Sequence, residues 1–347
     1  MKLEKATDTG DVLAVVSQSG PTVSFFDAGS HDLLDVLEVP AEPHELCFDP
    51  DRRLLYCTTT YRSGYYHVNT GRARELTVID PDARRVVEVL DLAPDHAPHG
   101  LALDRARGRL YVSVEATSHA PGGVLVIDTA SRKSIGRIDT MARGPHWFTV
   151  TPDGTRGYAT NKEAPYVSVV DLETGTLVDR IPVPGSEGIA ASPDGTTVAL
   201  AAPYGDLSRP PSDPTGVRLV DIAAGRVTGI LPTEHLVYPV HITATGLLLA
   251  GEVVVDRSHS GTALGVQRPG QVSVFALDRG ELLGALPVGR FPLTITSSPD
   301  GSRGYVAAVL DSTVTVLDLR TLEVVDTLRV ERRGEPGAHG LAYIPTP

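Results

Sequence analysis

The stretch that decides the fold is GPHWFTVTPDGTRGYATNKEAPYVSVVDLETGTLVDRIPV, residues 144–183. It contains four short runs rich in β-branched and aromatic residues, namely WFTV, RGYATN, YVSVVD and LVDRIPV. The segment TPDG joins the first two runs, and LETG joins the last two. Both are hairpin-turn sequences, with glycine where the backbone needs a positive φ. The stretch therefore predicts an antiparallel sheet of four strands.

The frame that opens this stretch, P-H-x-apolar, recurs along the chain with histidine kept or replaced at one slot. The apolar residue two places after the slot is found at Leu46, Leu101, Phe148, Ile189, Ile242, Ile295 and Leu341. Successive copies are 55, 47, 41, 53, 53 and 46 residues apart. Repeats of roughly 40–55 residues are typical of β-propeller blades. No stretch has a 3.6-residue apolar period, so we expect almost no helix.

The two ends of the chain complete the count of strands. Residues 11–39 contain three β-type runs that lack a first strand, and residues 339–344 supply one first strand. Joining them makes one shared blade and leaves no open sheet edge. We therefore predict a seven-bladed β-propeller of four-stranded antiparallel blades, with residues 1–347 as one domain and the ring closed by pairing 11–39 with 339–344.

The charge of the chain argues against two classes of partner. There are 43 acidic and 31 basic side chains, for a net charge of −12. Nucleic acid and anionic membranes both attract basic surfaces, so neither is expected as a partner. No run of about 18 apolar residues could cross a bilayer, and the N-terminus has no cleavage signature. We expect a cytoplasmic protein with a small-molecule substrate, and the oligomeric state stays open.

Two longer segments resemble the repeats of YVTN-type propellers. They are RGYATNKEAPYVSVVDLETGTLVDRIPV at 156–183 and RGYVAAVLDSTVTVLDLRTLEVVDTL at 303–328. The P-H openings followed by D-P-D or T-P-D-G also resemble the seven-bladed lactonase-type propellers, which include phosphogluconolactonases. The resemblance covers essentially the whole chain and implies the propeller fold. Such families contain binding proteins, hydrolases and lyases, so the resemblance implies no single activity.

In a propeller the first strand of each blade lines the central channel and starts at one mouth, here called the top. The slot stands at the beginning of that strand, so its seven copies should form a ring at the top. Five consecutive blades carry a potential metal ligand at the slot: His339, His44, His99, His146 and Glu187. The other two slots carry Val240 and Leu293. The ring should be polar on one side and apolar on the other.

Imidazole and carboxylate ligands suit Zn, Fe(II), Mn, Ni or Cu better than Ca or Mg. Three or four histidines leave a coordination position for water or substrate, as a catalytic metal requires. We therefore predict that a divalent transition metal, such as Zn, Fe, Mn or Cu, binds to His44, His99, His146, His339 and Glu187. Two alternatives stay open: a metal-free polar binding ring, and structural histidines that hydrogen-bond to neighbouring carbonyls.

The alternation of side chains along a strand predicts where residues beside the slot point. Strict alternation turns Glu45 into the blade, and His241 is one place off register, so it should point into the sheet unless a bulge intervenes. Glu115 and Glu163 end second strands on the top face and would orient two of the histidines. Trp147, the only tryptophan, is expected to pack between blades.

Four long connections between second and third strands should emerge on the top face, at residues 58–75, 115–123, 203–216 and 253–270. Long loops in compact domains are often functional, and these would cover the mouth of the channel and exclude water. The opposite face has only tight turns such as SPDG. The long loops therefore point to the top face as the substrate side.

Candidate catalytic residues are Glu187 in the ring and Tyr66, Arg257 and Arg268 in these loops. The two arginines would hold a substrate carboxylate or phosphate. Whether His67, His119, His241 or His259 joins the site stays open.

These features favour a metal-dependent enzyme acting on a small organic metabolite at the top of the channel. The resemblance implies hydrolase, lyase or isomerase chemistry on a lactone or ester-like substrate. One alternative is a non-haem Fe(II) or Cu oxygenase, because four propeller histidines around one iron resemble the carotenoid-cleavage oxygenases. Another is a non-catalytic propeller that binds a ligand or protein. The absence of GxSxG, P-loop, GxGxxG, HExxH and CxxC motifs leaves serine-hydrolase and nucleotide-dependent chemistry without support.

Overall fold

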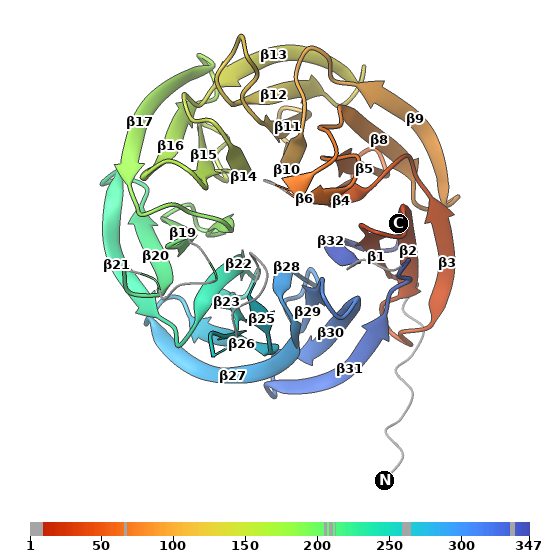
Figure 1. Ribbon diagram of the computed structural model, residues 1–347, viewed down its shortest axis with the longest axis vertical. Helices are drawn as coiled ribbons and strands as arrows, with labels where there is room; N and C mark the ends of the chain where they lie inside the picture. Colours follow the sequence, from red (N-terminus) through yellow and green to blue (C-terminus); the bar gives the residue numbers. More distant parts are fainter. Residues whose placement is uncertain are drawn as a thin grey trace.

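The computed structural model describes residues 10–65, 68–204, 207, 211, 213–258, 265–333 and 337–347. These residues form strands and turns without a helix, and seven four-stranded antiparallel sheets are arranged as blades around one axis (Figure 1). The prediction of a seven-bladed propeller is confirmed. No helix in the described ranges has the length and apolar character needed to cross a membrane.

Each blade runs outward from the axis through four hydrogen-bonded strands (Figure 1). The terminal blade contains β32 (Ala338–Ile344), β1 (Val12–Ser17), β2 (Thr22–Asp27) and β3 (Leu33–Glu38). The second contains β4 (Pro43–Asp49), β5 (Leu54–Thr59), β8 (Glu75–Asp80) and β9 (Arg85–Asp91). The third contains β10 (Pro98–Asp104), β11 (Arg109–Val114), β12 (Gly123–Asp128) and β13 (Lys133–Asp139). The fourth contains β14 (Pro145–Val150), β15 (Arg156–Asn161), β16 (Tyr166–Asp171) and β17 (Thr176–Pro182).

The fifth blade contains β18 (Ile189–Ala191), β19 (Thr197–Ala202), β20 (Gly216–Asp221) and β21 (Arg226–Pro232). The sixth contains β22 (Leu236–Ile242), β23 (Leu247–Val253), β26 (Pro269–Ala276) and β27 (Glu281–Arg290). The seventh contains β28 (Pro292–Ser297), β29 (Arg303–Ala308), β30 (Thr313–Asp318) and β31 (Glu323–Arg329). Two small hairpins project from top-face loops: β6 (Gly64–Tyr65) with β7 (Val68–Asn69), and β24 (Val255–Asp256) with β25 (Val266–Gln267).

The ring closes as predicted, because β1 pairs antiparallel with β32 and Val12 lies opposite Ile344. The hydrophobic core lies between neighbouring blades. One such cluster joins Phe25 of the terminal blade to Leu55 and Cys57 of the next. Both cysteines are free thiols. Because every blade packs against two neighbours, the positions of the first strands around the axis are tightly determined.

A β-bulge interrupts the first strand of six blades just after its start. In β4, Pro43 pairs with Thr59 but Leu46 pairs with Cys57, so one extra residue is accommodated. The same shift occurs in β10, β14, β22, β28 and β32. A bulge sets two residues of one strand opposite one of its partner and breaks the strict alternation of side chains. The slot residue and the residue after it can therefore both face the axis.

Second-strand hydroxyl groups connect these bulges to the next blade. Oγ1 of Thr58 accepts a hydrogen bond from the backbone N–H of Glu45 at 3.1 Å and donates to the carbonyl of His99 at 3.1 Å. Oγ of Ser113 likewise donates to the carbonyl of His146 at 2.5 Å. These bonds satisfy backbone groups that the bulge removes from the ladder. They also hold successive histidine positions close together.

Glycine follows two of the histidines because neighbouring first strands approach closely there. A Cβ atom at Gly100 would lie 2.8 Å from the carbonyl oxygen of His146, and one at Gly340 would lie 2.5 Å from that of His44. Only a residue without a side chain fits such an approach. The P-H-G and A-H-G sequences therefore permit the close packing that brings the histidine rings into contact.

Candidate metal centre

Four slot histidines meet at the top of the channel. Their ring centroids are 4.1 Å apart for His339 and His44, 4.7 Å for His44 and His99, and 4.2 Å for His99 and His146. Their exposed fractions lie between 2% and 6%. The first strands of four consecutive blades thus bring together residues that the repeat alignment placed at one slot. We call these four residues the histidine cluster.

The Nδ1 atom of every ring in the histidine cluster is buried. Nδ1 of His99 has no hydrogen-bond partner among the described residues, whereas Nδ1 of His44, His146 and His339 each face a carboxylate oxygen at 3.1–3.4 Å. Oε2 of Glu187 is also buried and has no hydrogen-bond partner in the described ranges. Buried polar atoms in proteins nearly always form hydrogen bonds, so each exception calls for an explanation such as an ion. The unbonded Nδ1 of His99, together with the ligand atoms of His44, Glu45 and His339 within 4.8 Å of one another, is the chemistry expected of a cation site.

Glu45 lies inside the cluster, and the expectation that it turns into the blade is wrong. Its Oε1 is 3.2 Å from Nδ1 of His339 and 3.4 Å from Nδ1 of His44. One ligand atom from each of these three residues lies within 4.8 Å of the others, which would suit a shared metal ion. The bulge in β4 is the reason, because it turns both His44 and Glu45 toward the axis.

Glu187 closes the other end of the cluster. Its Oε1 lies 3.1 Å from Nδ1 of His146 and 3.3 Å from Nζ of Lys162. Sequence reasoning missed Lys162, which directly follows β15 and reads as a surface turn residue. Its side chain is 9% exposed and its Nζ is 5.4 Å from the ring centre of Tyr204. The structure instead exposes Glu163, the neighbour predicted to orient His146.

A hydrogen-bond chain fixes the ring of His99. The hydroxyl of Tyr61 lies 3.1 Å from Nε2 of His99 and donates to Oε1 of Glu115 at 2.5 Å. Nε of Arg72 donates to the other oxygen of Glu115 at 2.6 Å. Because Tyr61 donates to the carboxylate, it accepts from the imidazole, which therefore carries its proton on Nε2 and leaves the Nδ1 lone pair available. Glu115 orients His99 as predicted, but through a tyrosine.

The electrostatics favour neutral imidazoles. Burial lowers the pKa of His99 to about 4, although Glu115 opposes the shift. Burial also holds the pKa of His44 and His146 well below the usual range, and neighbouring positive groups add to the effect. Neutral imidazole is the form that binds metals. Three histidines of the cluster are therefore ready to ligate at neutral pH.

The three buried carboxylates of the site differ in the direction of their pKa shifts. Burial raises the pKa of Glu187 to about 7, against the opposing charge of Lys162. Burial likewise raises the pKa of Glu45, against the opposing effect of His339. For Glu115 burial acts in the same direction, but the nearby ring of His99 and hydrogen bonds from Tyr61 and Arg72 outweigh it and lower its pKa to about 2. Glu115 is thus a permanent anion, whereas Glu45 and Glu187 readily hold protons.

Tyr66, His67 and His259 lie outside the described residues. Arg257 is exposed, and Arg268 donates to Asp256 at 2.6 Å within its own hairpin. Neither arginine forms an ion pair or hydrogen bond with the histidine cluster in the described ranges, so their role as substrate anchors stays a prediction.

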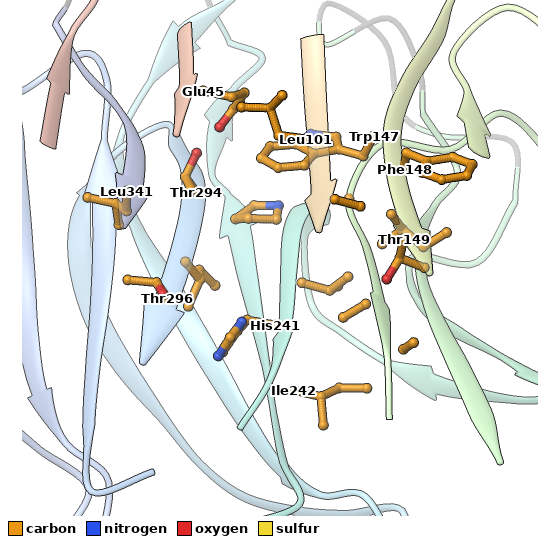
Figure 2. Close-up of a pocket in the computed structure, with 18 of the residues that line it drawn as sticks. Glu45, Leu101, Trp147, Phe148, Thr149, His241, Ile242, Thr294, Thr296 and Leu341 are labelled. Atoms are coloured by element: carbon orange, nitrogen blue, oxygen red, sulfur yellow. The ribbon is translucent and has the colours of Figure 1, made fainter. Parts of the chain in front are cut away.

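A cavity of about 350 Å³ lies in the channel, and Glu45, the neighbour of His44, lines one end of it (Figure 2). His241 lines it and shares a 2.8 Å hydrogen bond with Ser297. The sequence placed this histidine in the sheet unless a bulge intervened, and β22 contains such a bulge between Val237 and Val240. Trp147 packs between the fourth and fifth blades as expected, but it also lines the cavity. His119 is exposed on the top face.

Comparisons with known proteins agree with the fold. No protein-family model matches the chain. The uncharacterized protein YncE of Salmonella typhi is 27% identical over 158 residues, which cover 44% of this chain and 40% of YncE. YncE of Escherichia coli K12 is 26% identical over 159 residues, with the same coverage. The aligned region thus spans well under half the length of these curated relatives.

Two solved structures share the architecture. Hydrazine synthase of Kuenenia stuttgartiensis superposes with a TM-score of 0.69 and 20% identity, covering 92% of this chain and 96% of the matched one. A functionally unknown protein from Desulfotomaculum acetoxidans gives 0.72 and 13% identity, covering 96% and 98%. At such identities the likeness shows the fold alone. The YncE-like relatives and the seven-bladed ring together support a β-propeller family for this chain.

Proposed function

We propose that this protein is a metal-dependent enzyme acting on a small organic molecule at the histidine cluster. The observation that carries the proposal is the set of buried Nδ1 atoms on His44, His99, His146 and His339, with Oε1 of Glu45 within 3.4 Å of two of them. Imidazole and carboxylate donors suit Zn, Fe, Mn or Cu. His44, His339 and Glu45 would form the compact part of the ligand set, and His99 and His146 would complete it.

A bound metal would polarise a substrate carbonyl or activate a water molecule. The chain supplies the remaining functions. Tyr61 and Glu115 hold His99 in one tautomer, and the cluster excludes bulk water through its burial. Glu187 would exchange a proton with the substrate, since its Oε2 has no hydrogen-bond partner among the described residues and Lys162 contacts its other oxygen.

Hydrolysis or elimination on a lactone or ester-like substrate is the reaction class proposed first. Its support is the resemblance of the repeats to YVTN-type and lactonase-type propellers, which is an analogy of fold. An Fe(II) or Cu oxygenase is the second candidate. It is favoured by four imidazoles meeting in one buried cluster, which exceeds the three protein ligands common at hydrolytic zinc.

Elemental analysis of protein purified without added metal tests the proposal. We expect close to one equivalent of a transition metal in the wild type, its loss in His44→Ala, and its retention in the control His119→Ala, which changes an exposed histidine. Metal-loaded protein is then assayed for ester or lactone hydrolysis and for oxygen consumption. Absence of metal, with no thermal shift on adding Zn, Mn or Fe(II), would reject the metal-dependent function and leave a non-catalytic binding propeller.

A further inference from the structure

The cavity in the channel runs along the first strands toward the face opposite the long loops. That face carries the tight turns between first and second strands, such as TPDG, and we call it the hairpin face. In β14 its lining extends from Trp147 to Val150, the last residue of the strand, and in β18 it reaches the last residue, Ala191. Figure 2 shows Glu45 and Trp147 toward one end and His241 and Ile242 toward the other. The cavity therefore connects the level of the cluster with the face opposite the long loops.

Exposure to solvent changes along this path. Pro145 and His146 at the top of β14 are buried, whereas Thr149 and Val150 at its lower end are partly exposed. In β28, Pro292 is buried at the top, and Thr296 is partly exposed near the lower end. Water therefore reaches the channel walls at the hairpin end. At the level of the ring, the four histidines and Tyr61 are each at most 6% exposed, whereas Leu293 on the apolar side of the ring is partly exposed.

The walls of the cavity indicate what it would hold. Apolar side chains such as Leu101, Val240 and Leu341 form much of the surface, and the described lining residues include no lysine or arginine. Trp147 presents a large flat indole, and Thr149, Thr296 and His241 offer hydrogen bonds. A volume of 350 Å³ falls at the lower end of ligand pockets, which span roughly 300–1,000 Å³. An anion would find no cationic partner in this lining.

We propose that this cavity binds a small, uncharged, largely apolar molecule that enters from the hairpin face and packs against Trp147. Its polar end then reaches Glu45 and the histidine cluster. The inference deepens the proposed function, because it names the substrate class and the route to the same site. It differs from the expectation that substrate arrives beneath the long loops and is held by arginines.

Trp147 is the only tryptophan in the chain, so the intrinsic tryptophan fluorescence reports on the cavity alone. The test uses the full-length metal-free protein and acrylamide, a small neutral quencher. Thr296→Phe and Thr149→Phe each narrow the lower channel, from different blades. Thr176→Phe, an identical change at an exposed outer-strand position, is the matched control. Thermal melting checks that each variant is folded. Two plug variants are used so that the test remains possible if one of them does not fold.

We expect each folded plug variant to lose most of the acrylamide quenching, while the control quenches like the wild type. Unchanged quenching in the plug variants would overturn the route. Benzyl alcohol and benzoate, matched in size but not in charge, test the ligand class. Benzyl alcohol should protect Trp147 from acrylamide in a saturable way, and Thr296→Phe should abolish this protection. Equal protection of Trp147 by benzoate, or no protection by either probe, would overturn the proposed ligand class.

Because no metal is present, this result is independent of metal binding. If the quenching results contradict the channel but the purified protein contains metal, the proposed metal-dependent function stands and only the route and ligand class are rejected. If the plug variants and the ligand probes behave as expected but the protein purifies without metal, the protein would be a propeller that binds a ligand without a metal-dependent reaction.

Discussion

Oε1 of Glu45 lies 3.2 Å from Nδ1 of His339, although one residue stands in the second blade and the other in the last strand of the chain. The contact exists because the ring closes by pairing β1 with β32, which sets β32 beside β4. It also needs the bulge in β4, which turns Glu45 toward the axis. The compact part of the candidate metal site is therefore built at the closure of the propeller.

Glu45→Gln should abolish tight metal binding and leave the fold intact. The amide keeps the size of the side chain but loses the charge that the carboxylate brings to a cation. We expect a loss of affinity beyond the roughly 10–100-fold typical of partners that only orient a ligand. Titration calorimetry with Zn²⁺ measures it. Glu163→Gln, an exposed matched control, should bind like the wild type, and equal affinity in both variants would remove Glu45 from the ligand set.

Tyr61→Phe should weaken metal binding by about 10–100-fold, because the variant loses the hydroxyl that sets the tautomer of His99. Metal affinity is again the readout, with circular dichroism to verify the fold. Tyr166→Phe is the control, since that hydroxyl donates to the carbonyl of Met141 on the exposed surface. If the two variants bind metal equally well, Tyr61 has only a packing role.

Lys162→Met should destabilise the protein, because it leaves Glu187 buried without its cationic partner. Removing one member of a buried ion pair typically costs about 3–5 kcal/mol, and protonation of Glu187 would lessen this cost. The free energy of unfolding in urea measures it. The double variant Lys162→Met/Glu187→Gln should recover part of the loss. Lys133→Met, on an exposed outer strand, should have little effect. Additive losses in the double variant would argue against a coupled pair.

His241 should make stability depend on pH in a defined window. Burial lowers its pKa to about 4 in the folded protein, against an ordinary value of 6.5. Between these values the unfolded chain binds the proton first, so stability is lost as pH falls. From about pH 7.5 to about pH 5, the wild type should lose about 2 kcal/mol more than His241→Gln. Urea unfolding at both pH values tests this, and parallel losses in the two proteins would contradict it.

The architecture could be predicted because the strand and turn preferences that define a blade are local in sequence and recur in each copy. The turn sequences TPDG and LETG, the four strand runs and the spacing of the copies each indicate an antiparallel blade. The missing first strand at one end and the lone first strand at the other indicated the closure. The same alignment placed His44 beside His339, because position within a repeat determines height along the axis.

Three features of the site did not follow from this pattern. Glu45 faces the axis because of a bulge, and a pattern of alternating side chains carries no mark of an extra residue. Lys162 turns inward to Glu187, although its sequence context is that of a surface turn. Tyr61 stands between His99 and Glu115, which is a contact between residues of neighbouring blades.

The sequence by itself thus determined the number of blades, the closure of the ring and the height at which the histidines stand, since these depend on local strand and turn preferences repeated seven times. Only the tertiary structure decided which side chains face the axis, which charges pair there, and which residues line the cavity of the channel. Those properties depend on bulge geometry and on the packing of one blade against the next, and residues far apart in the chain set both.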